Sequence, residues 1–131
     1  MEKTSEQKRA AHALNVIKSM QGNQDGKYRS YVQGLPASIV MDGLGQMAAT
    51  LLAAAKGKTE DDHHRLHDNL QDWLRTAGAI DPQRTLLEFL TACTQDQYIW
   101  AQAEALSYLV WLKKFSQAYL AEGVNAEGLQ G

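Results

Sequence analysis

The chain has 131 residues, about the size of one domain, of which 44% are hydrophobic and 21% charged. Its single cysteine, Cys93, excludes an internal disulfide, and its net charge of −2 argues against nucleic-acid binding through overall positive charge. Local basic patches remain compatible with that charge. The polar N-terminus and the short apolar run at 47–55 favour a soluble, cytoplasmic protein without a membrane partner.

The first half of the chain predicts a series of helices. A capping box, Thr4 with Gln7, opens a helix that should end near Met20. A short helix is expected over 27–33, and Leu35-Pro36 should begin the next one. Because 39–55 is almost entirely apolar or small, we expect a single buried helix there. Its apolar stripe should consist of Val40, Leu44, Met47 and Leu51, with Gly43 and Gly45 allowing another helix to approach closely.

The second half predicts three more helices. Thr59 should cap a fourth helix that ends at Gly78. Asp81-Pro82 should open a fifth, and the capping box of Thr94 with Gln97 a sixth. The apolar face of the fourth helix should contain Leu66, Leu70, Trp73 and Leu74.

The last helix carries the densest apolar pattern. Its primary face should consist of Tyr98, Ala101, Ala105, Tyr108, Leu109, Leu112, Phe115 and Tyr119, with Gln95, Gln102 and Lys113 on the wet side. A second stripe, Trp100, Glu104 and Trp111, either completes the core against the first helix or anchors a protein partner. Glu104 needs a cation or a donor if it is buried.

These patterns predict an all-α, single-domain bundle of about five to six helices with a long C-terminal helix. We expect the bundle to occupy 1–122 and the Gly-, Asn- and Glu-rich segment 123–131 to be a flexible tail. Cys93 is expected to be a small core residue at a helix end.

The histidine-rich segment is the most enzyme-like feature. His63 and His67 are four residues apart, so both rings lie on one helix face. A catalytic zinc site usually needs three protein ligands, and His64 does not have the spacing to be the third. His64 also stands where a His-Glu-x-x-His helix has its glutamate, and a solvated helix face is the favoured interpretation. Neither a nucleophile elbow nor a phosphate loop is present. We therefore expect no enzymatic activity, no cofactor and no metal site.

Three small basic clusters are candidates for phosphate contacts. Lys27 and Arg29 flank Tyr28, Lys113 and Lys114 are adjacent, and the third cluster is Lys56 with Lys58. Such cations hold phosphates without reading sequence, and a nearby aromatic ring can stack on a base. The alternative is that they are ordinary solubilising charges.

Two blocks of sequence resemble a known family. The first comprises Lys27-Tyr28-Arg29-Ser30-Tyr31-Val32, Leu35-Pro36, Ile39-Val40 and Gly43-Leu44-Gly45-Gln46. The second comprises Glu104-Ala105-Leu106-Ser107-Tyr108-Leu109 and Trp111-Leu112-Lys113-Lys114-Phe115. With Leu70-x-x-Trp73-Leu74 between them, they resemble the small all-helical (fifth) subunit of the type III-B CRISPR RNA-silencing (Cmr) effector complex. The chain has Ile99 and Trp100 where that family often carries arginines.

The resemblance implies a non-catalytic structural subunit in antiviral defence. Its copies would stack beside the backbone subunit that holds the CRISPR RNA and would help to accommodate target RNA. The implied partners are the other effector subunits, further copies of the chain and the RNA backbone. The candidate RNA contacts are then Lys27, Arg29, Lys113 and Lys114. The alternatives are a helical adaptor without a nucleic-acid role and a His-rich metal-binding protein.

Overall fold

The protein is described by a computed structural model, which covers residues 2–22 and 26–122; the expected tail at 123–131 lies outside the described residues. The described ranges contain six α-helices and no strand, which confirms the predicted all-α bundle. The helices are α1 (Ser5–Ser19), α2 (Lys27–Asp42), α3 (Leu44–Ala55), α4 (Asp62–Thr76), α5 (Leu86–Ala92) and α6 (Gln95–Tyr119). None of these helices is long and apolar enough to cross a membrane.

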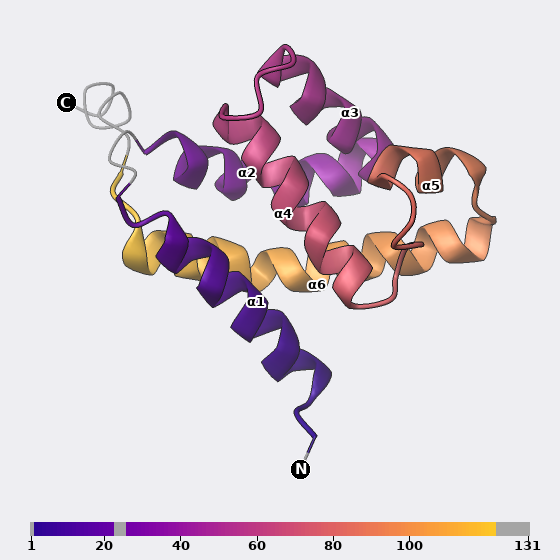
Figure 1. Ribbon diagram of the computed structural model, residues 1–131, viewed down its shortest axis with the longest axis horizontal. Helices are drawn as coiled ribbons and strands as arrows, with labels where there is room; N and C mark the ends of the chain where they lie inside the picture. Colours follow the sequence, from indigo (N-terminus) through magenta and orange to yellow (C-terminus); the bar gives the residue numbers. More distant parts are fainter. Residues whose placement is uncertain (1, 23–25, 123–131) are drawn as a thin grey trace.

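The long helix α6 organises the bundle. It runs along the long axis of the molecule, and α1 crosses it (Figure 1). Helices α1, α2 and α4 make the most extensive contacts with α6, while α3 packs mainly on α2, α4 and α5. One hydrophobic core joins all six helices, from Ala13 and Ile17 of α1 to Leu86 and Leu90 of α5.

Capping boxes start three of the helices. The predicted boxes at Thr4 and Thr94 are confirmed, and each threonine hydroxyl accepts the backbone N–H of the glutamine three residues later. A third box, Thr85 with Glu88, opens α5, so the expected start at Asp81-Pro82 is wrong. The Asp81 side chain instead accepts the Gln83 N–H at 2.8 Å and closes a turn. The predicted cap at Thr59 is also wrong, because Asp61 caps α4 through the His63 N–H.

Helix α2 continues through Pro36, so the predicted division into two helices near Gly34 is wrong. A proline inside a helix removes a hydrogen bond and costs about 3 kcal/mol or more. The buried residues show why the helix persists, since they follow one helical face on both sides of the proline. They are Tyr28, Val32, Leu35 and Ile39. Burial of this continuous stripe in the core outweighs the local cost.

The expected single helix over 39–55 is broken at Gly43, which has φ 91°. Side chains of α6 replace the missing cap of α3. The Gly45 N–H donates to the Tyr98 hydroxyl at 2.8 Å, and the Leu44 N–H donates to the Gln102 carbonyl oxygen at 2.9 Å. A Cβ at Gly45 would lie 3.2 Å from the Tyr98 hydroxyl oxygen, so this glycine does permit a close approach. Gln102 therefore packs against α3 and is not on the wet side of α6.

Several expected core positions are exposed or only partly buried. Val40, expected in the central stripe, is 71% exposed, because the buried face of α2 passes through its neighbour Ile39 and Val40 points about 100° away from it. Tyr119 is 45% exposed in the last turn of α6, and Cys93 is half-buried. The middle of the predicted α6 face is confirmed. Its buried members are Ala101, Ala105, Tyr108, Leu109 and Leu112.

Candidate protein and nucleic-acid contact surfaces

Glu104 lies inside the bundle and joins three helices. Its carboxylate accepts hydrogen bonds from Arg9 Nε at 2.6 Å and Nη2 at 2.9 Å, and from Trp73 Nε1 at 3.0 Å. The Arg9 hydrogen bonds hold the pKa of Glu104 below its ordinary value; burial opposes that shift and the Trp73 bond adds to it. Glu104 was expected either to complete the core or to contact a protein partner, and the structure supports the first interpretation. Its hydrogen-bond partners are the donors that a buried carboxylate needs.

A second polar cluster lies beside the first. His12 Nδ1 is 2.7 Å from the Tyr108 hydroxyl, and His12 Nε2 is 2.7 Å from the Asp72 carboxylate. The Trp73 and Tyr108 rings stack with centroids 5.4 Å apart. Burial raises the pKa of Tyr108, so its hydroxyl stays protonated. These contacts dock α1 on α4 and α6.

The sequence pattern did not assign the α1 residues of these clusters a role. Glu6, Arg9 and His12 are three residues apart, so they line one side of α1 next to its apolar face. This three-residue spacing was the only indication in the sequence that these residues act together. It predicts a polar stripe on α1, but it does not predict the residues that contact the stripe, because those belong to α4 and α6, which are distant in sequence.

The three members of the second α6 stripe have different surroundings. Trp111 is half-buried, and its Nε1 donates to Glu6 Oε2 at 2.8 Å, so it ties α6 to α1. Trp100 is 53% exposed, and its indole N–H makes no hydrogen bond to the described part of the chain. Of Trp100, Glu104 and Trp111, Trp100 is therefore the residue most available to another molecule.

Two of the three predicted basic clusters lie near the same end of the bundle, and we call their residues, Lys27, Arg29, Lys113 and Lys114, the basic end. Helix α2 runs alongside the end of α6, where Gln33 hydrogen bonds with Ser116 and Gln117. The first turn of α2, with Lys27 and Arg29, therefore lies towards the C-terminal end of α6 (Figure 1).

The four cations differ in availability. Arg29 is half-buried and pairs with Glu122 at 3.5 Å, which neutralises part of its charge. Lys27 and Lys114 are exposed, while Lys113 is half-buried. Neither Lys113 nor Lys114 forms an ion pair with the described residues. Consecutive helix residues point about 100° apart, so these two lysines face different directions.

Four exposed aliphatic side chains lie on α2 and α6. Val40 and Met41, in the last turn of α2, are 71% and 81% exposed. Ile99 and Val110, on the outer face of α6, are 57% and 51% exposed. The contact of the α2–α3 junction with Tyr98 and Gln102 places the end of α2 beside the start of α6. We call Val40, Met41, Ile99 and Val110 the apolar edge.

The histidines of α4 are hydrogen bonded to carboxylates. His63 Nδ1 is 2.8 Å from Asp61, and His64 and His67 are each 2.9 Å from Asp68. Over residues 2–22 and 26–122, no three His, Cys, Asp or Glu side chains are arranged to hold a metal ion. His67 is buried, and its Nε2 lacks a partner among those residues.

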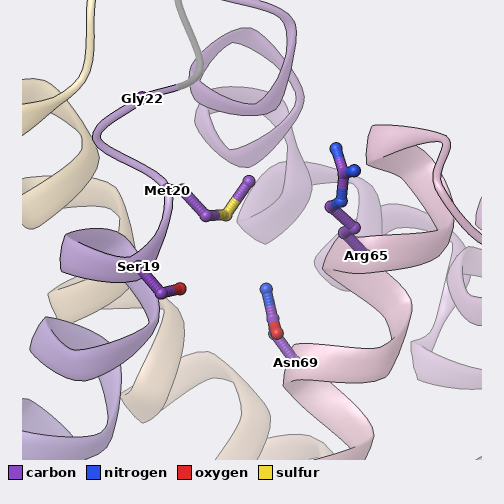
Figure 2. A pocket seen from close by; sticks show the side chains of 5 residues that line it. All are labelled: Ser19, Met20, Gly22, Arg65 and Asn69. Atoms are coloured by element: carbon purple, nitrogen blue, oxygen red, sulfur yellow. The ribbon is translucent and has the colours of Figure 1, made fainter.

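A hollow of about 360 Å³ lies between the end of α1 and the first half of α4 (Figure 2). It is lined by Ser19, Met20, Gly22, Arg65 and Asn69. Its polar side chains are already engaged, because Ser19 donates to the α1 backbone, Arg65 pairs with Asp62 and Asn69 donates to Tyr28. The lining offers no reactive group, so we do not assign a site there.

Comparison with protein-family models matches residues 5–119 to a family described as CRISPR-associated protein (Cas_Cmr5). The match spans all six helices, from the first residue of α1 to the last residue of α6. It therefore includes the α1–α6 polar clusters, the basic end and the apolar edge.

Proposed function

The chain belongs to the CRISPR-associated Cmr small-subunit family of type III-B systems, and from that membership we propose that it is a non-catalytic structural subunit that repeats along the effector complex. The match across all six helices is the observation that carries the proposal. In this role the chain contacts further copies of itself and the backbone subunit, in the cytoplasm. It helps to accommodate target RNA on the CRISPR RNA during antiviral defence.

The apolar edge supports the protein-contact part of this proposal. Each of the four apolar side chains is more than half exposed in the isolated chain, so its apolar surface is available to a protein partner. The buried centre of a protein interface is apolar and depleted of charge. Burying this edge against a neighbouring subunit removes apolar surface from water, which stabilises the assembly.

The cations near the end of α6 support the RNA-contact part. Lys113 and Lys114 keep their charge free of ion pairs within the described residues, so they are available to phosphates. Contacts of this kind position RNA without reading its sequence. That suits a subunit for which base pairing with the CRISPR RNA supplies the specificity.

The double substitution Met41→Asp with Val110→Asp tests the assembly role. Both side chains are exposed, so the isolated chain should keep its helical circular dichroism and its melting temperature. When the chain is co-expressed with the other effector subunits and pulled down through one of them, its recovery should fall severalfold. The reason is that buried, unpaired carboxylates are costly at an interface.

Ala49→Asp, exposed on α3, is the control and should leave recovery unchanged. Full recovery of the double variant would show that the apolar edge is not an assembly surface.

A further inference from the structure

A second cleft, of about 530 Å³, opens where α1 crosses α6 beside the end of α4. Lys3, Lys8 and Arg9 line it from the start of α1, Trp73 from α4, and Trp100 and Glu104 from α6. The volume is in the usual range of small-ligand sites, roughly 300–1,000 Å³. The cleft shares no residue with the basic end or the apolar edge, and the proposed function has not used it.

The charge of the cleft is positive once internal pairs are removed. Arg9 and Glu104 neutralise each other through two hydrogen bonds of 2.6 and 2.9 Å. Lys3 and Lys8 are exposed, and neither forms an ion pair with the described residues. Two ammonium groups on flexible stems therefore remain at the rim, where they attract an anion.

Trp100 provides the aromatic surface of the cleft. It also lines a neighbouring hollow of about 380 Å³, formed by the turn at 78–82 together with Phe89 and Gln97. The indole of Trp100 therefore borders two hollows. The other two tryptophans are tied to glutamates through their N–H groups, Trp73 to Glu104 and Trp111 to Glu6. Trp100 has no such bond to the described residues, so its ring is free to contact a ligand.

An exposed indole beside unpaired cations suits a planar, anionic ligand. A nucleotide of a single strand has both properties, because its base stacks on aromatic rings and its phosphates pair with cations. An acidic peptide is less well matched. The residue best suited to grip a carboxylate with two hydrogen bonds is an arginine, and the fork of Arg9 is already occupied by Glu104.

We propose that this cleft binds a nucleotide of single-stranded RNA, with the base stacked on Trp100 and the phosphates held by Lys3 and Lys8. The choice of RNA as the ligand rests on the proposed function. The cleft adds a base-stacking site to the contacts with the RNA backbone that are proposed for the basic end. Stacking on an indole tolerates every base, so binding at this cleft is independent of sequence.

The test uses the isolated full-length chain and a short fluorescein-labelled oligouridylate, with binding followed by fluorescence anisotropy. Trp100→Ala should weaken binding about 5- to 150-fold, the usual effect of removing one stacking ring, and Trp100→Phe should restore part of the affinity. Lys3→Ala with Lys8→Ala should weaken binding and reduce the slope of log affinity against log salt by about 1.4, or about 0.7 for each lost phosphate contact.

Matched controls are Tyr119→Ala, which removes another exposed aromatic ring of α6, and Lys18→Ala, which removes an exposed cation at the other end of α1. Both should bind the oligonucleotide as the unchanged chain does. Circular dichroism confirms the fold of each variant, and Trp100→Phe serves if Trp100→Ala does not fold.

The proposal would be overturned if the unchanged chain did not bind the oligonucleotide. It would also be overturned if the Trp100→Ala variant bound the oligonucleotide as tightly as the unchanged chain. If that variant were in addition no longer recovered with the effector subunits, the cleft would be a protein-docking site. Either result leaves the assembly role, tested through the apolar edge, as a separate question.

Discussion

At the scale of single residues, the contact between Arg9 and Glu104 decides how α1 is held. It joins two residues 95 positions apart, and both side chains are mostly buried, with 17% and 10% exposed. Removing one partner from such a pair leaves the other charge without compensation, which is more costly than removing an exposed pair.

The pair predicts a loss of stability in acid. The pKa of Glu104 is lowered in the folded protein, so between its folded and ordinary values the unfolded chain binds more protons. The contribution of Glu104 to the free energy of unfolding is therefore complete above its ordinary pKa and is lost as the pH falls through the folded pKa. Glu104→Gln should lower the free energy of unfolding by about 1–3 kcal/mol at neutral pH.

Urea denaturation followed by circular dichroism, from neutral pH to about pH 3, provides the measurement. The stability difference between the unchanged chain and Glu104→Gln should shrink towards acid. Glu60→Gln, at an exposed position, is the control and should run parallel to the unchanged chain. A constant difference at every pH would contradict the assigned role of Glu104.

At the scale of elements, local signals predicted most helix ends but not the middle of the chain. Threonine with glutamine three residues later located the starts of α1 and α6, because a capping box acts within one turn. The failures at Pro36 and Gly43 have a different cause. The first depends on core burial along α2, and the second on Tyr98 and Gln102, which approach from a helix more than 50 residues away.

The candidate surfaces were predictable to a similar degree. The sequence indicated that Glu104 needs a donor, and its pattern placed Trp100 and Trp111 on the same stripe. It did not separate them, because their surroundings are set by other elements. Trp111 meets Glu6 of α1, whereas Trp100 lies where α1, the end of α4 and the turn at 78–82 leave space.

The break at Gly43 predicts different outcomes for two neighbouring glycines. Gly43→Ala forces a left-handed backbone on a residue with a Cβ, so it should destabilise the fold by about 1–3 kcal/mol. A Cβ at Gly43 would also lie 3.2 Å from the Tyr98 hydroxyl oxygen, so Tyr98→Phe should relieve part of the cost and leave the part that arises from φ. Gly45 is helical, and its added Cβ would meet the Tyr98 hydroxyl at 3.2 Å. Gly45→Ala should therefore be neutral or stabilising once that hydroxyl is removed.

The measurement is a double-mutant cycle of urea-denaturation midpoints for the two glycine substitutions, each with and without Tyr98→Phe. Equal behaviour of the two glycines in the Tyr98→Phe background would contradict the separation of backbone strain from side-chain contact.

At the scale of the whole molecule, three surfaces share helix α6. The basic end lies where α2 begins and α6 ends, and the cleft lies where α1 crosses α6. The apolar edge extends from the end of α2 and Ile99, near the start of α6, to Val110, one turn before Lys113 and Lys114. A repeating subunit that joins neighbours and borders an RNA needs both kinds of contact surface, and α6 contributes residues to all three.

The basic end carries a prediction for the assembled complex. Lys113→Glu with Lys114→Glu should weaken target-RNA retention and leave the fold intact, because both residues are at the surface of α6 without ion pairs to the described residues. Each lost phosphate contact reduces the slope of log affinity against log salt by about 0.7–0.9.

Filter binding of labelled target RNA to the purified complex at several salt concentrations would measure this effect. Lys56→Glu with Lys58→Glu, in the turn between α3 and α4, makes the same change in charge and should have a much smaller effect. An unchanged affinity and salt slope for the Lys113 and Lys114 variant would remove these two residues from the RNA contact.

The docking of α1 through two polar clusters has one more consequence. Part of the cleft wall is α1 itself, so the cleft is complete only while Arg9 and His12 hold that helix against α4 and α6. Local opening of α1 and occupancy of the cleft are then linked equilibria. A ligand that bridges Lys3 or Lys8 to Trp100 would connect the start of α1 to α6 and so favour the docked position of α1. The α1 amide protons should then exchange with solvent more slowly in the presence of the ligand than in its absence.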